Sequence, residues 1–130
     1  MPPITEKIAC TPLPLGPAGF NSRAALPFGC SIKHIQAAMQ EFIDFLGFID
    51  AQMNTRQLSR LESMLMPANF SSIVGEFMSS TIPKHCRGLV KNCCHNGHPD
   101  LIPANRFEND MCQHGTEGIE PAFPLLSSYR

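Results

Sequence analysis

Residues 98–120, with the sequence HPDLIPANRFENDMCQHGTEGIE, organise the second half of the chain. A Pro-Asp pair is followed by the apolar Leu101 and Ile102, which predicts a short strand beginning at Asp100. Residues 118–120 form a second β-compatible segment, and the polar residues between the two segments predict a hairpin-type connection. Because such a connection places the segments side by side, Asp100 and Glu120 are candidate ligands of one divalent cation.

The composition is that of a globular protein. The chain has 130 residues, of which 43% are hydrophobic and 16% are charged, enough for one domain with a core. The net charge of -1 provides no overall basic field that would attract nucleic acid. The N-terminus has no apolar run of signal-peptide length, and Asp44 and Asp50 interrupt the most apolar helix candidate. We therefore expect no membrane span and a cytoplasmic protein whose six cysteines stay reduced.

The first half of the chain predicts an arm followed by a long helix. Residues 1–30 are rich in proline and glycine, which predicts an irregular arm. Ser31 is a suitable N-cap for a helix that extends to about residue 54. An apolar stripe at steps of three and four predicts a core helix, although a homodimer seam would need the same stripe. The stripe consists of Ile32, Ile35, Met39, Phe42, Leu46, Ile49 and Met53, widened by Ile43, Phe45 and Phe48.

Two shorter helices and a strand complete the prediction. The helices are expected over residues 55–66, ended by Pro67, and over residues 69–78, followed by a break at 79–83. Glu76 in the third helix would join a metal site if it faced the later strands. A short strand is expected over residues 88–90. The fold class is α+β: an irregular arm over residues 1–30, then one domain over residues 31–130 with about three helices and a small β-hairpin region.

A local basic segment precedes Asp100. Lys84, Arg87 and Lys91 lie between residues 84 and 98, where no acidic residue occurs. Three cations over so short a span are candidate contacts for the phosphates of DNA. Charged runs of this kind more often form an ordinary solvated surface.

The segments GHPDLIP (97–103) and EGIE (117–120) resemble the PD-(D/E)XK nuclease superfamily, and in particular the type II restriction endonucleases. The resemblance implies a restriction-endonuclease-like fold that hydrolyses phosphodiester bonds of double-stranded DNA with Mg²⁺ held by Asp100 and Glu120. The family's lysine, two residues after the glutamate, corresponds to Ala122, and from Pro121 onward the chain departs from the pattern. We therefore expect a truncated or altered copy that binds Mg²⁺ weakly and cleaves DNA poorly or not at all.

Three other functions compete with the nuclease hypothesis. A zinc-binding module would take its ligands from Cys94, His98, Cys112 and His114, although no CxxC motif is present. A cysteine nucleophile is disfavoured, because neighbours such as His85 and Cys86 point to opposite faces of a strand. A non-catalytic interaction protein would associate through the long-helix stripe. Polar substitution of Phe42 or Leu46 would then abolish self-association, and Asp100 would be irrelevant to it.

Overall fold

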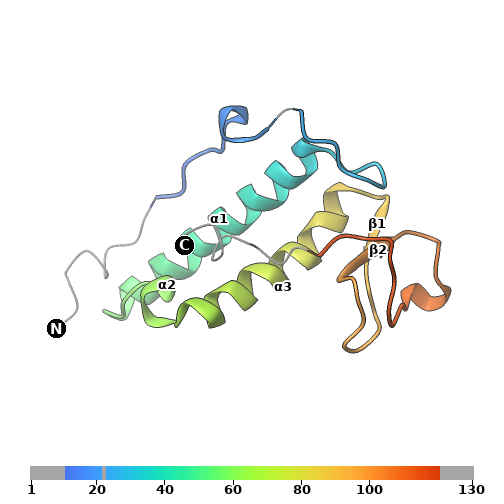
Figure 1. Cartoon of the computed structure of the whole chain (residues 1–130). Helices are drawn as coiled ribbons and strands as arrows, with labels where there is room; N and C mark the ends of the chain where they lie inside the picture. The colour runs from blue at the N-terminus through green and yellow to red at the C-terminus, as the bar shows by residue number, and fades with distance from the viewer. Residues whose placement is uncertain (1–10, 22, 121–130) are drawn as a thin grey trace.

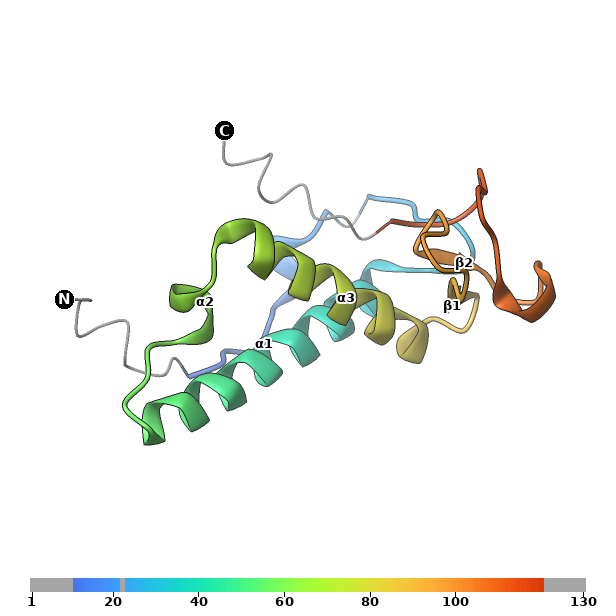
Figure 2. The same cartoon turned by 90° about the horizontal axis from the view of Figure 1, so that it is seen from below.

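The computed structural model describes residues 11–21 and 23–120, which adopt the predicted α+β fold (Figure 1). The two long helices lie side by side and run in opposite directions, and the two strands lie beyond the C-terminal end of the second (Figures 1 and 2). The elements are α1 (Ile32–Thr55), α2 (Leu61–Met64), α3 (Pro67–His85), β1 (Leu89–Lys91) and β2 (Leu101–Pro103), with short 3-10 turns at Pro17–Gly19 and Glu108–Asp110. Predictions for residues 1–10 and 121–130 lie outside the described residues.

Helix α1 begins where the sequence predicts and packs on α3. Ser31 is the N-cap residue, and its backbone N–H donates to His34 Nδ1 at 3.0 Å. Phe42 is buried, and its ring centroid lies 5.3 Å from that of Phe77 on α3. The stripe therefore forms the contact between helices, as the core-helix prediction requires. The widening of the stripe is wrong at Phe48, which is 61% exposed.

The predicted helix over residues 55–66 is wrong. The chain leaves α1 after Thr55, and Gln57 has a φ of 60°, which a continuing helix does not allow. Only α2 is helical in this segment, and the buried carboxylate of Asp50 accepts a hydrogen bond from the backbone N–H of Leu61 at 2.9 Å. The chain turns here because a buried side chain on α1 satisfies the first free N–H group of α2.

Helix α3 is longer at both ends than predicted. Pro67 is its first residue rather than a terminator, since the first turn of a helix does not need that N–H group. The predicted break at residues 79–83 is also wrong, because the helix continues to His85 through Pro83. Met78 and Ile82 are buried, so packing of this face outweighs the backbone hydrogen bond that proline removes near the helix end.

The β region contains the predicted strands with small shifts. Strands β1 and β2 are antiparallel, with Val90 opposite Ile102 and Lys91 opposite Leu101. Asp100 immediately precedes β2 rather than beginning it. Residues 118–120 contribute only a single bridge, in which Leu101 and Ile119 exchange two backbone hydrogen bonds of 2.9 Å. The predicted neighbourhood of the Asp100 and Glu120 segments is therefore confirmed, although the second segment is not a full strand.

Glycine is required where these two segments meet. Gly118 has a φ of 146°, and a Cβ atom there would lie 2.2 Å from the Leu101 carbonyl oxygen. Any side chain would push the Glu120 segment away from β2. The glycine of the EGIE motif therefore allows the two acidic segments to approach each other.

The described part of the arm is irregular, as predicted, and is attached to α1. Gln40 Oε1 accepts a hydrogen bond from the Leu15 N–H at 2.6 Å, and Gln36 Nε2 donates to the Leu15 carbonyl at 2.7 Å. Further along, Phe28 packs on the core and Cys30 is buried in it. The arm therefore crosses the N-terminal half of α1 and ends beside the C-terminal end of α3 (Figure 1).

Candidate functional site

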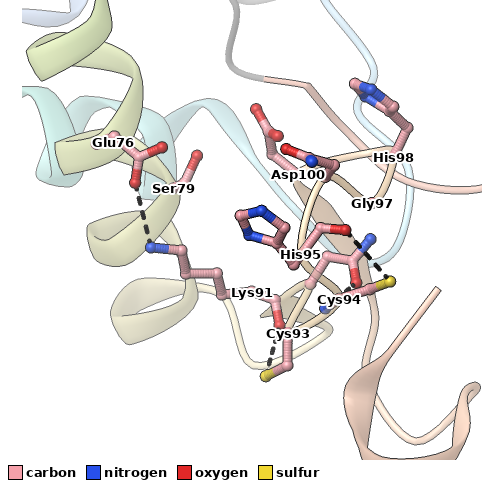
Figure 3. A pocket seen from close by; sticks show the side chains of 11 residues that line it. Glu76, Ser79, Lys91, Cys93, Cys94, His95, Gly97, His98 and Asp100 are labelled. Carbon is pink, nitrogen blue, oxygen red and sulfur yellow. Dashed lines mark hydrogen bonds and ion pairs between the residues drawn. The ribbon is translucent and has the colours of Figure 1, made fainter. Parts of the chain in front are cut away.

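A cleft of about 900 Å³ separates α3 from the loop between β1 and β2 (Figure 3). Glu76 and Ser79 line it from α3, Lys91 lines it from β1, and Asp100 lines it from the position just before β2. The remaining lining residues come from the connecting loop and are Asn92, Cys93, Cys94, His95, Asn96, Gly97 and His98. Carboxylate, ammonium and imidazole groups thus face one solvent-filled space, a combination suited to binding an ion or a phosphate.

Asp100 lies among carboxylates from two other segments. Partial burial raises the pKa of Asp100 above its ordinary value, and the negative charges of Glu120 and Glu76 raise it further. His98 and Lys91 act in the opposite direction. The three acids singled out from the sequence therefore come from α3, the start of β2 and the segment after Ile119, and they affect one another electrostatically. Like charges gathered in this way favour a bound cation.

The other two acids also contact basic side chains. Glu76 Oε2 lies 3.4 Å from Lys91 Nζ, and Glu120 Oε1 lies 2.7 Å from His98 Nδ1. All four side chains are 41–78% exposed, so these ion pairs contribute little stability. A divalent cation that entered the cleft would displace them at low cost.

The predicted phosphate contacts occupy different places. Lys91 lies in the cleft, where its ammonium group also contacts Ser80 Oγ at 3.4 Å. Lys84 instead reaches α1, with Nζ 3.1 Å from Glu41 Oε2. Arg87 is exposed in the turn between α3 and β1 and is not among the residues that line the cleft. Of the three cations, only Lys91 lies beside the acids.

Asn92 fixes the walls of the cleft, a role that the sequence did not indicate. Its Nδ2 donates to the carbonyls of Pro99 at 2.9 Å and Cys112 at 2.7 Å. Its Oδ1 accepts from the N–H groups of Cys94 and Cys112, both at 3.0 Å. The Asn92 side chain thus joins β1 to two parts of the β1–β2 loop, at Cys94 and Pro99, and to Cys112 in the later segment. An asparagine in a turn is too common for such a network to be predicted from sequence.

The predicted zinc ligands do not converge. The rings of His98 and His114 lie with centroids 6.5 Å apart, but Cys94 Sγ is directed to the His95 carbonyl at 3.7 Å. Cys112 is buried, and its Sγ lies against the backbone at Gly115. Among residues 11–21 and 23–120, the one set of three or more ligand atoms all within 4.8 Å of one another belongs to Cys30, His34 and Cys86.

This thiol–imidazole group could hold a metal ion, and it lies away from the cleft. Cys30 ends the arm, His34 is in the first turn of α1, and Cys86 follows α3. Sequence reasoning missed the group because 52 residues separate His34 from Cys86 (86 minus 34). By the same 4.8 Å measure, the carboxylates of Glu76, Asp100 and Glu120 are not drawn together into a single compact ligand set.

Comparison with known proteins gives no match: no family model fits the sequence, and no curated protein or solved structure is detectably similar to it. None of the helices in the described ranges is long and apolar enough to span a bilayer.

Proposed function

We propose that this protein is a restriction-endonuclease-like chain whose cleft binds Mg²⁺ for the hydrolysis of phosphodiester bonds in double-stranded DNA. The observation that carries the proposal is the electrostatic coupling of Asp100 to Glu76, which lines the same cleft, and to Glu120, which does not line it but contacts His98 at its wall. The GHPDLIP and EGIE segments, which resemble the PD-(D/E)XK nucleases, contain two of these three acids.

Mg²⁺ suits the separation of the three acids. This ion keeps several bound waters and usually takes only one or two carboxylates from a protein, so the acids need not form a compact cage. Asp100 and Glu120 are the proposed direct ligands, and Glu76 is proposed to bind through water or to replace one of them. The bound ion would polarise a phosphoryl oxygen and lower the pKa of an attacking water.

Lys91 is the proposed cation for the phosphate. Its Nζ lies in the cleft beside Glu76. The next residue, Asn92, connects this strand to the Asp100 segment, because its backbone N–H donates to the Asp100 carbonyl at 2.8 Å. An ammonium group there would neutralise part of the charge that develops on the phosphoryl oxygens. In the family, a lysine two residues after the glutamate supplies this positive charge, but here that position is Ala122. Lys91 would supply part of the missing charge. We expect slow cleavage, because Lys91 approaches from another strand.

The proposed partner and compartment follow from this function. The substrate is double-stranded DNA, and the proposed location is the cytoplasm, where the free thiols among the described cysteines would stay reduced. A homodimer remains a prediction. Phe42 is buried in this fold, so substituting it would test folding rather than association. Phe48→Asp is the better test, because that ring is 61% exposed.

The experiment combines Mg²⁺ calorimetry with a plasmid-cleavage assay on the same samples. The wild-type chain should bind Mg²⁺ and nick plasmid slowly. Asp100→Asn and Glu120→Gln should lose both activities, and Lys91→Ala should lose cleavage while keeping Mg²⁺ binding. Glu108→Gln, an exposed acid outside the cleft, is the matched control and should behave as wild type. Equal Mg²⁺ binding by wild type and Asp100→Asn would reject the site.

A further inference from the structure

The end of the arm with the start of α1 meets the end of α3, which is distant in sequence, at the end of the helix pair opposite α2 (Figures 1 and 2). The arm ends there at Cys30, α1 begins with His34 in its first turn, and α3 ends just before Cys86. The two sulfur atoms and a ring nitrogen of His34 all lie within 4.8 Å of one another. We propose that Cys30, His34 and Cys86 bind a zinc ion that fastens the arm to the helix pair.

The donor atoms suit zinc rather than magnesium. Zinc prefers thiolate and imidazole ligands in a tetrahedral arrangement, whereas Mg²⁺ requires oxygen ligands. Ligand atoms of one tetrahedral zinc are roughly 3.5–4 Å apart for bonds of 2.0–2.3 Å. The two sulfur atoms are no more than 4.8 Å apart and therefore need to approach each other by about 1 Å or less to reach that spacing.

The charge of a bound zinc ion is compatible with the burial of its two cysteine ligands. Cys30 and Cys86 are 5% and 1% exposed, in the apolar core. Burial raises the pKa of the Cys30 thiol to about 11, and the neighbouring Cys86 thiol contributes to this increase. The Cys30 thiol therefore stays neutral on its own. A zinc ion would remove both protons, and two thiolates with one Zn²⁺ leave no net charge in the core.

His34 is held in an orientation that suits a ligand. Its Nδ1 lies 3.0 Å from the backbone nitrogen of Ser31 and 3.3 Å from Ser31 Oγ. Nδ1 is thus occupied by Ser31, and the proposal assigns metal binding to Nε2. In this structure the Ser31 N–H donates to Nδ1, so binding of zinc through Nε2 would move the ring proton to Nδ1 and replace that hydrogen bond by one donated to Ser31 Oγ, an outer contact of the kind that usually orients a ligating histidine.

Backbone oxygen is available for the fourth position. The Phe28 carbonyl oxygen lies 3.9 Å from Cys86 Sγ, close to the separation of two ligands on one zinc. This carbonyl also leaves no room for a side chain at position 88, because a Cβ atom on Gly88 would lie 1.9 Å from the carbonyl oxygen. The arm is therefore pressed against the turn after α3 even without metal, and zinc would bind to a largely formed site.

The test is Co²⁺ titration of the reduced, metal-free full chain, because cobalt bound by thiolates gives a charge-transfer absorption in the near ultraviolet. The expected result is one such site per chain, from which Zn²⁺ displaces cobalt and raises the unfolding temperature. Cys30→Ser and Cys86→Ser should abolish the absorption, and His34→Gln should weaken binding by about tenfold or more. Cys93→Ser, an exposed cysteine, is the matched control and should leave binding unchanged.

Each alternative gives a distinct result. Loss of the absorption in Cys94→Ser or Cys112→Ser, with Cys30→Ser unaffected, would move the metal to the other cysteines and overturn the proposal. A Cys30–Cys86 disulfide, seen as a loss of two hydrogen masses in the untreated protein, would identify a redox pair instead. No absorption in the folded wild type would also reject zinc. His34→Gln keeps both thiols, so it tests the site even where Cys86→Ser fails to fold.

Discussion

The helix pair, α1 with α3, and the β-loop region, residues 89–120, are held together by different forces. Buried apolar side chains such as Phe42, Met78 and Ile82 join the helices. The β-loop region joins the same core through the buried Leu89 and Leu101, but two three-residue strands and the hydrogen bonds of one asparagine hold the rest of it. The cleft lies where the two regions meet. The helix pair thus supplies Glu76, and the β-loop region supplies the remaining groups of the proposed site.

The largest expected effect is on the helix pair. Ile82 is 2% exposed, and Ile82→Ala should lower the free energy of unfolding by about 2–5 kcal/mol through lost burial and the cavity left behind. Urea denaturation measures this loss. Lys33→Ala, an exposed site on α1, should change the same quantity by no more than about 0.5 kcal/mol. A similar result for both variants would contradict the packing described for α3.

The next largest effect is expected in the β-loop region alone, with the helix pair unchanged. Asn92→Ala removes four hydrogen bonds and should lower the free energy of unfolding by roughly 2–6 kcal/mol, at about 0.5–1.5 kcal/mol for each bond. Amide hydrogen exchange should speed up in residues 92–100 and at Cys112, and remain slow in α3. Asn54→Ala, at the exposed end of α1, is the control. Uniform acceleration across both regions would show that they unfold as one unit.

Helix periodicity explains which parts of this fold could be predicted. The start of α1 and its buried face follow from Ser31 and the apolar spacing, which are local properties. The extent of α3 does not, because burial of Ile82 outweighs the local effect of Pro83. Similarly, the acids were recognised from two short motifs, whereas the roles of Asn92 and Cys86 depend on contacts between distant segments. Sequence reasoning identified charged groups and missed the residues that position them.

A smaller effect is expected at the edge between the regions. Lys84→Ala removes an exposed ion pair with Glu41 and should lower the free energy of unfolding by about 0.2–1 kcal/mol. Because Lys84 contacts α1 rather than the cleft, DNA binding should be reduced less than by Lys91→Ala. Fluorescence anisotropy with labelled duplex DNA measures the difference. Equal losses would place Lys84 in the DNA-binding surface.

The smallest effect on the metal-free chain concerns Asp100. Its pKa is raised in the folded state, so folding is favoured when this carboxyl is protonated and becomes less favourable as pH rises from the ordinary value of 3.8 through the raised pKa. Asp100→Asn removes the charge. The variant should therefore be slightly more stable than wild type at pH 7 and equal to it at pH 3, as measured by thermal unfolding. If the variant were less stable than wild type at pH 7 but equal to it at pH 3, the ionised carboxylate would be stabilising, contrary to this prediction.

The most direct test of the proposed site is a Mg²⁺ titration followed by two-dimensional amide NMR of the wild-type chain. The proposal predicts saturable shifts at Glu76, Asp100 and Glu120 and in the loop between β1 and β2. It predicts no such shifts at Glu108 or Glu117, which are acidic but neither line the cleft nor contribute to the raised pKa of Asp100. Shifts spread evenly over all acidic residues, or no saturable shift at Asp100, would contradict the central claim that the two regions form one divalent-cation site.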